Sequence, residues 1–394
     1  MRPLEPNGRA GKPLPTALIE TVGGHCGMNH YDLALCQGLR NAGCAVSLYT
    51  CDQTADTHLT GVGFYPLFRK IHGDGNRWMK GMRFLTGCVR TAWQMLRNHE
   101  RICHYQLFNQ ILPESVVIAL ARLTGRKLIL TVHDVSAFGG CGARQRKASG
   151  WLYNRAHRVI VHNRISRQEL AAIGVAEEKI RIVPHGHYAA THSVLPPRSE
   201  ARHRLGLGDH ETVILFFGQI KEAKGLEVLI EAMPAVLSKV PHARLLIAGR
   251  PFRIEMTGYE ALLHGLGLDA HCLLHIGFIP DDEVSTYYAA ADMVALPYRK
   301  IYQSGVLVMA MTYGHPVIVS AIPGMTEMVK DRETGYLFRE GSSADLAEKI
   351  VYAVEHPKES QQIGRHAAEC VRSQFDWDRI GQATRQIYDE VLKP

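Results

Sequence analysis

Short apolar runs alternate with longer amphipathic segments along most of the chain, and they predict strands and helices in turn. In the first half, Thr16–Thr21 and Ala45–Thr50 are apolar runs of strand length. Between them, His30–Ala42 has the apolar spacing of a helix, and Gly43 ends it. Further strands are expected at Leu128–Val132, Arg158–His162 and Ile180–Pro184. Such alternation predicts βαβ units and a parallel sheet.

The same alternation starts again after residue 210. Strands are expected at Val213–Phe217, Ala243–Ala248, Leu273–Ile276, Met293–Leu296 and Pro316–Ser320. Helices are expected at Leu226–Val240, Tyr259–Leu266, Asp282–Ala290 and Gly305–Tyr313. We therefore predict an α/β protein of two Rossmann-like, doubly wound domains that face each other across a ligand-binding cleft.

The domain limits follow from the segments that lack this alternation. Residues 191–210 contain Pro196-Pro197 and several charges but no apolar run, which predicts a linker. It separates an N-terminal domain at 16–190 from a C-terminal domain at 211–375. We expect residues 1–15 to form a disordered tail. Residues 376–394 are expected to form a helix that crosses back to the N-terminal domain.

Composition supports two cores and narrows the setting. The chain has 394 residues, of which 46% are hydrophobic and 21% charged. It has no uncharged apolar run of about 18 residues and no apolar leader, so we expect neither a transmembrane helix nor a signal peptide. The nine cysteines are odd in number and form no Cys-x-x-Cys pair. We therefore expect a cytoplasmic protein with reduced thiols and no zinc site.

The net charge of +7 is unevenly spread. Residues 1–185 hold 24 Lys and Arg against 12 Asp and Glu, whereas residues 186–394 hold 21 against 26. A basic N-terminal half indicates an anionic partner: a membrane surface, a phosphorylated acceptor or nucleic acid. The alternative is a basic surface with no partner. No nucleic-acid recognition module accompanies the charge, which argues against that partner.

Two loops of the second half carry candidate chemistry. The loop from Gly218 to Gly225 follows a predicted strand and opens a helix, and Lys224 lies at the helix N-terminus, where the helix dipole favours anions. The segment 297–306 also joins a strand to a helix; there Ser304 can cap the helix, and the N–H groups of Gly305 and Val306 can take a phosphate. A solvated lysine and simple capping are the alternatives. Together the two loops favour a diphosphate site.

The order of several short motifs resembles retaining family 4 glycosyltransferases. In the second half these are Gly218–Lys224, His275–Pro280, Ala291-Asp292 with Leu296-Pro297, Tyr313–Ile318, Pro323–Glu327 and Thr334–Leu337. In the first half they are Gly23-Gly24, Val132-His133-Asp134 and Lys179–Gly186. The resemblance implies the GT-B fold and transfer of a hexosyl group from a nucleotide-diphosphate sugar, which we expect to be UDP- or GDP-linked. No Asp-x-Asp motif lies at a predicted strand end, so we expect no metal and no other cofactor.

The resemblance also implies residue roles. Lys224 and His133 would be catalytic, Lys224 at the donor diphosphate and His133 near the reacting sugar. Gly24 would line the leaving-phosphate site from the first domain. The remaining donor-binding residues would be Gly218, Gln219, Gly277, Phe278, Ile279, Gln303, Ser304, Gly305 and Val306.

One departure from the family concerns the sugar. Many relatives carry two glutamates eight positions apart, and this chain has Ile301 and Met309 there. Neither side chain can accept a hydrogen bond from a hydroxyl. Glu327 is our hypothesis for a replacement carboxylate. Gln219 likewise replaces an Arg of many relatives.

Basic and aromatic residues mark the acceptor side. Residues 64–99 form an expected amphipathic segment with Arg77, Lys80 and Arg83 among Trp and Met side chains, typical of an anionic membrane surface; an ordinary core helix is the alternative. Arg144, Arg146 and Lys147 follow a Gly-rich stretch and would meet an acceptor phosphate. We expect a sugar acceptor linked to a polyprenyl diphosphate, as in surface or exopolysaccharide assembly, and a protein that is peripheral at the inner face of the cell membrane.

Two other functions remain open. One is a catalytically silent, sugar-nucleotide-binding partner subunit, which the missing glutamates favour. The other is a nucleotide-sugar epimerase with a GT-B-like fold.

Overall fold

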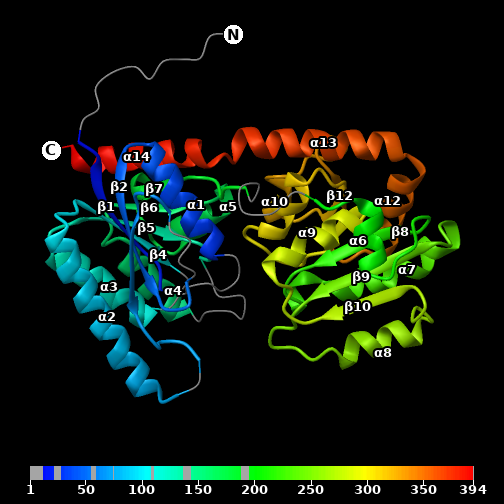
Figure 1. Ribbon diagram of the computed structural model, residues 1–394, viewed down its shortest axis with the longest axis horizontal. Coiled ribbons are helices and arrows are strands. Elements are labelled where there is room, and N and C mark those ends of the chain that lie inside the picture. The colour runs from blue at the N-terminus through cyan, green and yellow to red at the C-terminus, as the bar shows by residue number, and fades with distance from the viewer. Residues whose placement is uncertain are drawn as a thin grey trace, which may run out of the picture. The chain divides into compact units, whose positions relative to one another are not determined.

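The computed structural model of the protein describes residues 12–21, 28–54, 59–73, 75–107, 111–135, 143–187 and 195–393. The chain divides into two units, each built around a parallel sheet (Figure 1). The first comprises Met1–His162, Ser166–Pro184 and Trp377–Pro394, and the second comprises Asn163–Ile165 and His185–Asp376.

The first unit has a seven-stranded sheet in the order β3-β2-β1-β4-β5-β6-β7. Its strands are β1 (Leu14–Ile19), β2 (Cys44–Cys51), β3 (Gly63–Phe68), β4 (Ile102–Leu107), β5 (Lys127–Val132), β6 (Arg158–Val161) and β7 (Ile180–Ile182). Every pairing is parallel, and the order reverses direction between β1 and β4. The predicted doubly wound topology is therefore confirmed in this unit.

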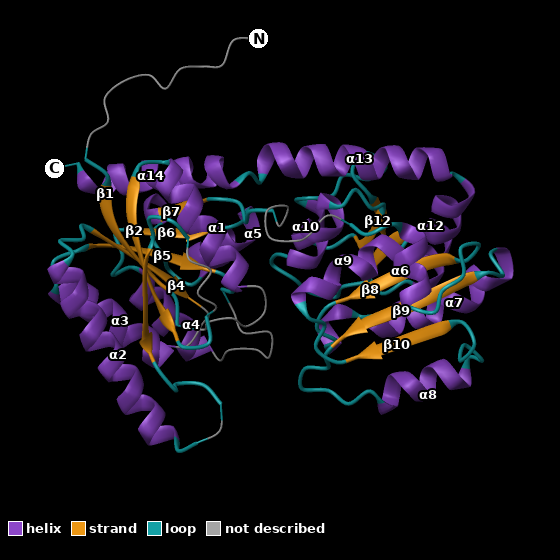
Figure 2. Ribbon diagram, viewed as in Figure 1, coloured by secondary structure: helices purple, strands orange, loops and turns teal. Residues whose placement is uncertain are grey.

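Helices cover both faces of this sheet (Figure 2). They are α1 (Met28–Asn41), α2 (Arg77–Arg97), α3 (Ile111–Leu123), α4 (Ala143–Tyr153), α5 (Arg164–Ala172), the short 3-10 helix η1 (Glu177–Lys179) and α14 (Trp377–Leu392). Strand residues alternate between two cores: Ala17 and Ile19 pack with α2 to α5, whereas Leu14 and Leu18 pack with α1 and α14. This period of two is what a strand buried on both faces requires.

The C-terminal helix α14 belongs to the first unit because its backbone lies directly against that of α1. A Cβ atom on Gly38 would lie 2.2 Å from the carbonyl oxygen of Trp377, and one on Gly381 would lie 2.1 Å from that of Gly38. Only glycine permits this approach. The Tyr388 hydroxyl lies 2.6 Å from Nδ1 of His104 on β4, which fixes the helix over the sheet.

The second unit has a six-stranded sheet in the order β10-β9-β8-β11-β12-β13, again parallel throughout. Its strands are β8 (Thr212–Phe217), β9 (Ala243–Gly249), β10 (Cys272–Ile276), β11 (Met293–Leu296), β12 (Val317–Ser320) and β13 (Tyr336–Phe338). The order reverses between β8 and β11, and ligands of such sheets bind outside the carboxyl ends of the strands at that reversal.

Two apolar layers enclose this sheet as well. The helices are α6 (Arg198–Arg204), η2 (Glu222–Lys224), α7 (Leu226–Lys239), α8 (Thr257–Gly265), α9 (Asp281–Ala290), α10 (Gly305–Thr312), α11 (Pro323–Thr326), α12 (Ser343–Glu355) and α13 (Pro357–Gln374). Along β8, Val213, Leu215 and Phe217 face α9 and α10, whereas Ile214 and Phe216 face α7 and α12.

Three strands, β3, β4 and β13, were not expected from the sequence. Strand β3 contains Pro66, which lacks an N–H donor and is tolerated because β3 lies at the sheet edge. Strand β4 has polar His104 and Gln106 at buried positions, which hides its apolar pattern. Strand β13 is only three residues long.

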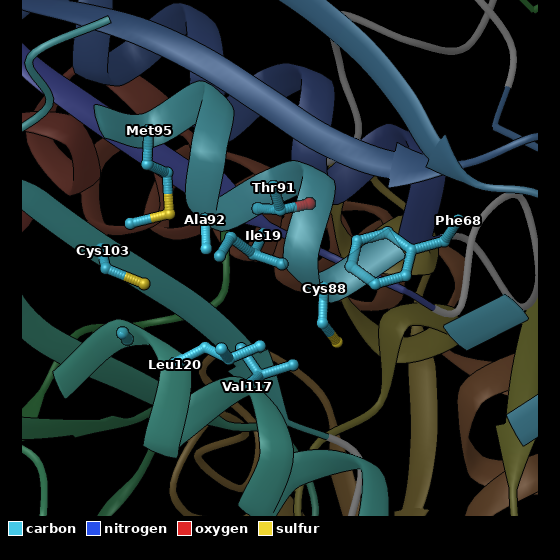
Figure 3. A pocket seen from close by; sticks show the side chains of 10 residues that line it. Ile19, Phe68, Cys88, Thr91, Ala92, Met95, Cys103, Val117 and Leu120 are labelled. Carbon is cyan, nitrogen blue, oxygen red and sulfur yellow. The ribbon is translucent and has the colours of Figure 1, made fainter. Parts of the chain in front are cut away.

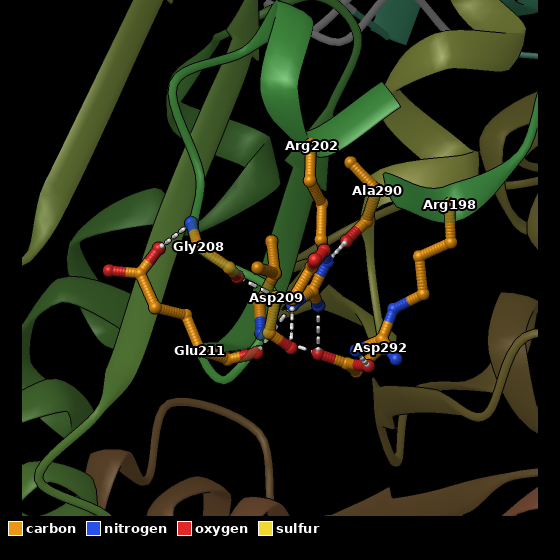
Figure 4. A network of polar contacts seen from close by, with 8 residues as sticks. Arg198, Arg202, Gly208, Asp209, Glu211, Ala290 and Asp292 are labelled. Atoms are coloured by element: carbon orange, nitrogen blue, oxygen red, sulfur yellow. Dashed lines mark hydrogen bonds and ion pairs between the residues drawn. The ribbon is translucent and has the colours of Figure 1, made fainter. Parts of the chain in front are cut away.

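The linker prediction for residues 191–210 is wrong for residues 198–210, which are part of the second unit. Helix α6 carries Arg202, whose side chain is fully buried (Figure 4). Its guanidinium donates to the carbonyl oxygens of Ala290, Gly208, Asp209 and Glu211 at 2.8–3.1 Å. It also donates to Asp292 Oδ2 at 2.7 Å. A charged segment that resembles a linker in sequence is thus anchored by an interior arginine.

No helix in the described ranges is both long and apolar enough to span a bilayer.

Replacing Arg202 by Met is expected to lower the free energy of unfolding by about 3–5 kcal/mol, because four backbone carbonyls and the partly buried Asp292 carboxylate lose a buried charged donor. Arg198 pairs with the same carboxylate at 2.5 Å but is half exposed, so Arg198→Met is the matched control and is expected to cost under about 1 kcal/mol. Urea unfolding followed by circular dichroism measures both. Equal losses in the two variants would contradict the anchoring role of Arg202.

Candidate functional site

Two loops of the second unit meet at the carboxyl ends of the adjacent strands β8 and β11. Gly225 has φ of 60°, and a Cβ atom there would lie 2.1 Å from the carbonyl oxygen of Pro297. The N–H of Arg299 donates to the carbonyl of Ala223 at 2.9 Å. The loop after β8 is therefore held against the loop after β11 by backbone contacts that a side chain at position 225 would prevent.

Lys224 lies at the centre of this junction. Its side chain is 7% exposed, and Nζ lies 2.6 Å from the Tyr298 hydroxyl and 4.2 Å from the centre of that ring. Burial lowers the pKa of Lys224 to about 7, because the charged ammonium is poorly solvated there. Nζ also lies 3.9 Å from the position that a Cβ would occupy on Gly218, which has φ of 99°. A side chain at position 218 would therefore lie directly against the ammonium and Val306.

Tyr298, which sequence reasoning missed, joins Lys224 to the start of α10. The phenol is fully buried, and burial raises its pKa, while a hydrogen bond with Ser304 acts in the opposite direction. An aromatic residue in a loop gives no sequence signal for such a role. Its hydroxyl positions the amine without neutralising it, since a phenol stays uncharged at neutral pH.

The N-terminus of α10 lies against the same glycine. A Cβ on Gly218 would lie 3.0 Å from Cγ2 of Val306. Ser304 caps the helix, with Oγ accepting from the N–H of Leu307 at 3.1 Å. The N–H groups of Gly305 and Val306 precede that donor and have no acceptor within the helix. Oε1 of Gln303 is buried with no hydrogen-bond partner in the described part of the chain, and such an atom indicates a ligand or water site.

The carboxyl ends of β9 and β10 lie next to the carboxyl end of β8. The Gly277 N–H donates to the Gly249 carbonyl at 3.1 Å, and a Cβ on Gly249 would lie 1.8 Å from the carbonyl oxygen of Gly218. The ends of β8, β9 and β10 are therefore in close backbone contact. Phe278 is 72% exposed, whereas Ile279 packs on the core. Gln219 follows Gly218 and is half-buried.

Ile301 and Met309 occupy the positions where many family members carry two glutamates. Both are partly buried and pack against the apolar core of the second unit, where neither side chain offers a hydrogen-bond acceptor. Glu327 already has hydrogen-bond partners. Its two carboxylate oxygens accept from the N–H groups of Arg164 and Ile165 at 3.0 and 3.2 Å. A role for Glu327 at the sugar stays a prediction.

His133 lies in a polar cluster of the first unit. It is 5% exposed, its Nε2 lies 2.7 Å from Oε1 of Gln106, and its Nδ1 lies 3.3 Å from Nε2 of His162. Tyr31 on α1 packs edge-on against His133, with ring centres 5.0 Å apart. His162 follows β6 as His133 follows β5, which was a usable sequence signal. Gln106 was not detectable, because β4 itself was missed.

Two buried carboxyl groups belong to the first unit. Glu20 follows β1 and is fully buried, and Asp32 on α1 is 1% exposed. Both oxygens of Asp32 lack a partner in the described structure, and burial raises the pKa of this carboxyl, with the Glu20 charge adding to the effect. An Asp inside a predicted helix gives no indication of this environment.

The remaining predicted residues are spread over several elements. Arg77, Lys80 and Arg83 lie on α2, and the exposed Lys147 lies on α4. Gly24 and the side chains of Arg144 and Arg146 lie outside the described residues. Across the described ranges, no group of three or more His, Cys, Asp or Glu side chains is placed to hold a metal ion. The structure thus brings together Gly218, Lys224, Ser304 and Val306, whereas the described acceptor-side residues Arg77, Lys80, Arg83 and Lys147 lie on two different helices.

The fold and the motifs define a protein of two Rossmann-like domains. Residues 26–188 match a family model described as Glycosyltransferase Family 4, and residues 197–369 match one described as Glycosyl transferases group 1. The chain belongs to the glycosyltransferases of the GT-B, family 4 type, as predicted.

Two curated relatives align over part of their length. An uncharacterised glycosyltransferase of Methanocaldococcus jannaschii is 28% identical over 242 residues, which is 60% of each chain. A lipopolysaccharide 1,2-N-acetylglucosaminetransferase of Salmonella typhimurium is 29% identical over 222 residues, which is 54% of this chain and 56% of that one. The chain therefore spans little more than half of these relatives.

Solved structures share the whole fold. Sucrose-phosphate synthase from Thermosynechococcus elongatus superposes with a TM-score of 0.77 at 22% identity, over 96% of this chain and 99% of that chain. HepE from Anabaena, in complex with UDP, gives 0.75 at 20% identity, over 95% and 100%. HepE was also solved with UDP-glucose.

Replacing Lys224 by Met is expected to raise the free energy of unfolding near neutral pH by roughly 2–5 kcal/mol. The folded-state pKa of about 7 lies below the ordinary 10.5, so the unfolded lysine binds its proton more tightly. This penalty on folding is full below about 7 and disappears as the pH rises to 10.5. The gain from Met should shrink over the same range.

Urea titrations across that pH range measure this change. The control is Lys300→Met on the neighbouring loop, where the lysine is exposed and the change should stay within about 0.5 kcal/mol. A Lys224→Met variant less stable than the parent near pH 7 would show that the ammonium is well compensated.

Proposed function

We propose that the protein is a retaining hexosyltransferase that moves a hexosyl group from a nucleotide-diphosphate sugar to a sugar acceptor. The observation that carries this is the buried Lys224 ammonium, which lies beside Gly218 and the N-terminus of α10. A cation and free helical N–H groups at one strand edge suit a diphosphate. Family membership supports the reaction class, and HepE, which was solved with UDP-glucose, supports the class of donor.

In the proposed reaction, the bond between the anomeric carbon and the terminal phosphate oxygen breaks, and its electron pair stays on the nucleoside diphosphate. Lys224 and the N–H groups of Gly305 and Val306 stabilise that developing charge. An acceptor hydroxyl oxygen bonds to the anomeric carbon on the face that the phosphate leaves, and its proton passes to the departing phosphate oxygen. The anomeric configuration is therefore retained. No metal or other cofactor is needed, because the lysine and the helix supply the compensating charge.

The roles of the other residues are part of the same proposal. Gly277, Phe278 and Ile279 contact the nucleotide base, with exposed Phe278 offering an apolar surface. His133 acts on the reacting sugar from the first unit. The acceptor is proposed to be a lipid-linked intermediate of surface polysaccharide assembly, since the Salmonella relative is named for lipopolysaccharide. The donor is a UDP- or GDP-linked sugar.

Ile301 and Met309 favour a second candidate, a silent sugar-nucleotide-binding subunit, because apolar groups replace the family's glutamates. A panel of UDP- and GDP-linked hexoses, screened by thermal shift and then by product formation on lipid-linked acceptors, distinguishes the two. Donor binding with product formation supports the enzyme. Donor binding without turnover on any acceptor supports the silent subunit, and no binding contradicts both.

Donor affinity should depend on pH through Lys224. A sugar nucleotide binds best to the protonated amine, so its affinity is expected to fall as the pH rises above about 7, by up to about tenfold per pH unit. Lys224→Met should bind about 10- to 100-fold more weakly, with no such pH dependence. Calorimetric titration with the sugar nucleotide selected by the screen measures both. Lys300→Met is the control, and affinity of the unmodified protein that does not change with pH would rule this role out.

His133→Ala is expected to lower kcat by about 100-fold while donor Kd stays unchanged, since His133 belongs to the first unit and Lys224 to the second. His157→Gln is the control, because His157 lies just before β6, at the amino ends of the strands, whereas His133 lies at their carboxyl ends. Steady-state kinetics and calorimetry separate the two quantities. A rise in donor Kd with unchanged kcat would assign His133 to binding instead.

A further inference from the structure

Helix α2 exposes an unusual amount of apolar surface. Seven large apolar side chains of this helix are 43–72% exposed: Trp78, Met79, Met82, Leu85, Val89, Trp93 and Leu96. Scattered apolar residues are normal on a protein surface, but a contiguous set indicates a binding surface.

The opposite side of α2 is firmly packed. Gly87, Cys88, Thr91 and Met95 are buried against the first unit, and a Cβ on Gly87 would lie 2.6 Å from the Phe68 ring. A cavity of about 10 Å³ beneath the helix is lined by Cys88, Met95 and neighbouring apolar side chains (Figure 3). That space holds at most one water molecule. The core of this unit therefore has no space beneath α2 for the exposed apolar side chains.

The outer face of α2 has two adjoining stripes. At about 100° per residue, the apolar stripe is centred roughly 140° around the axis from the buried side. This apolar stripe consists of Trp78, Met82, Leu85, Val89, Trp93 and Leu96. A basic stripe of Arg83, Arg90 and Arg97 lies about 100° further round. The Arg97 guanidinium lies 5.4 Å from the centre of the Trp93 ring. Cations beside aromatic and aliphatic groups are typical of helices that lie at a membrane interface.

The charge of α2 indicates which kind of partner binds its exposed face. Helix α2 contains five Lys and Arg residues and no Asp or Glu. Two copies of the helix packed face to face would bring these cations together, which disfavours a homodimer through this surface. The chain from residue 1 to 185 is basic as a whole, with 24 Lys and Arg against 12 Asp and Glu. An anionic surface with an apolar interior complements both stripes.

We propose that the outer face of α2 docks the first unit on an anionic lipid bilayer. The apolar stripe enters the boundary between headgroups and acyl chains, while the basic stripe binds lipid phosphates. The helix has 21 residues and lies in the plane of the interface. This surface is separate from the proposed glycosyl transfer and does not depend on it.

Binding of the full-length protein to vesicles of phosphatidylglycerol and phosphatidylcholine tests the proposal. Sedimentation with these vesicles should be strong at low salt and weak near 1 M salt, where the screening length falls to about 3 Å. Pure phosphatidylcholine vesicles should bind weakly. Arg83→Glu with Arg90→Glu should lower the partition coefficient by at least about 30-fold. Arg365→Glu with Arg372→Glu, both exposed on α13 of the second unit, is the charge-matched control and should bind normally.

Tryptophan fluorescence tests insertion directly. In a Trp151→Phe background, anionic vesicles should shift the emission to shorter wavelength, because Trp78 and Trp93 leave water and Trp377 is already buried. Adding Trp78→Phe and Trp93→Phe should remove the shift but keep binding, whereas Trp78→Ser with Trp93→Ser should weaken binding. Lys224→Met should bind vesicles normally, which separates this surface from the donor site.

Three results would overturn the proposal. One is absence of sedimentation with anionic vesicles. Another is equal loss of binding in the α2 and α13 charge variants. The third is self-association that Trp78→Ser with Trp93→Ser abolishes, without vesicle binding, since a second copy would then cover this face.

Discussion

The second unit is organised around one buried ammonium group. Burial of a cation is costly unless an anion compensates it, and Lys224 is held by a phenol, which bears no charge. Three neighbours shape its surroundings. Gly218 places no side chain against the ammonium, Gly225 allows the two loops to touch, and Ser304 caps the helix whose first N–H groups lie alongside. The buried ammonium destabilises the apo protein locally, and a bound diphosphate would compensate its charge.

The strand edge of the first unit has the opposite chemistry. Glu20 and His133 follow strands β1 and β5, the carboxyl group of Asp32 lies on α1, and the imidazole of His133 is hydrogen-bonded to the amide of Gln106. Such groups suit hydroxyls, whereas the edge of the second unit suits phosphates. A sugar acceptor presents hydroxyls and a sugar-nucleotide donor presents phosphates. Under the proposed function, the two halves of the chain, alike in fold, would take these different roles through a few side chains near the ends of their strands.

The sequence predicts a strand wherever the buried residues of that strand form an unbroken apolar run. Strand β8 is such a run on both faces, whereas β4 was missed because His104 is buried with Tyr388 and Thr131 as hydrogen-bond partners. Those partners lie 284 and 27 residues away along the chain, beyond any local pattern. Arg202 misled the linker prediction for the same reason. At the candidate site, Gly218, Lys224 and Ser304 follow predicted strands and could be selected from the sequence, but Tyr298 is revealed only by its contacts.

Because α14 belongs to the first unit, the second unit is inserted along the chain between two segments of the first. Residues 185–376 run without a break through nearly all of the second unit, whereas the first unit needs both ends of the chain. The Gly38–Gly381 contact between α1 and α14 therefore completes the packing of the first unit, and it can form only after the second unit has been synthesised. On a ribosome, the second unit can complete its sheet while the first still lacks one covering helix. The first unit therefore cannot complete its packing until the C-terminal helix has been made, although its strands are the first to emerge.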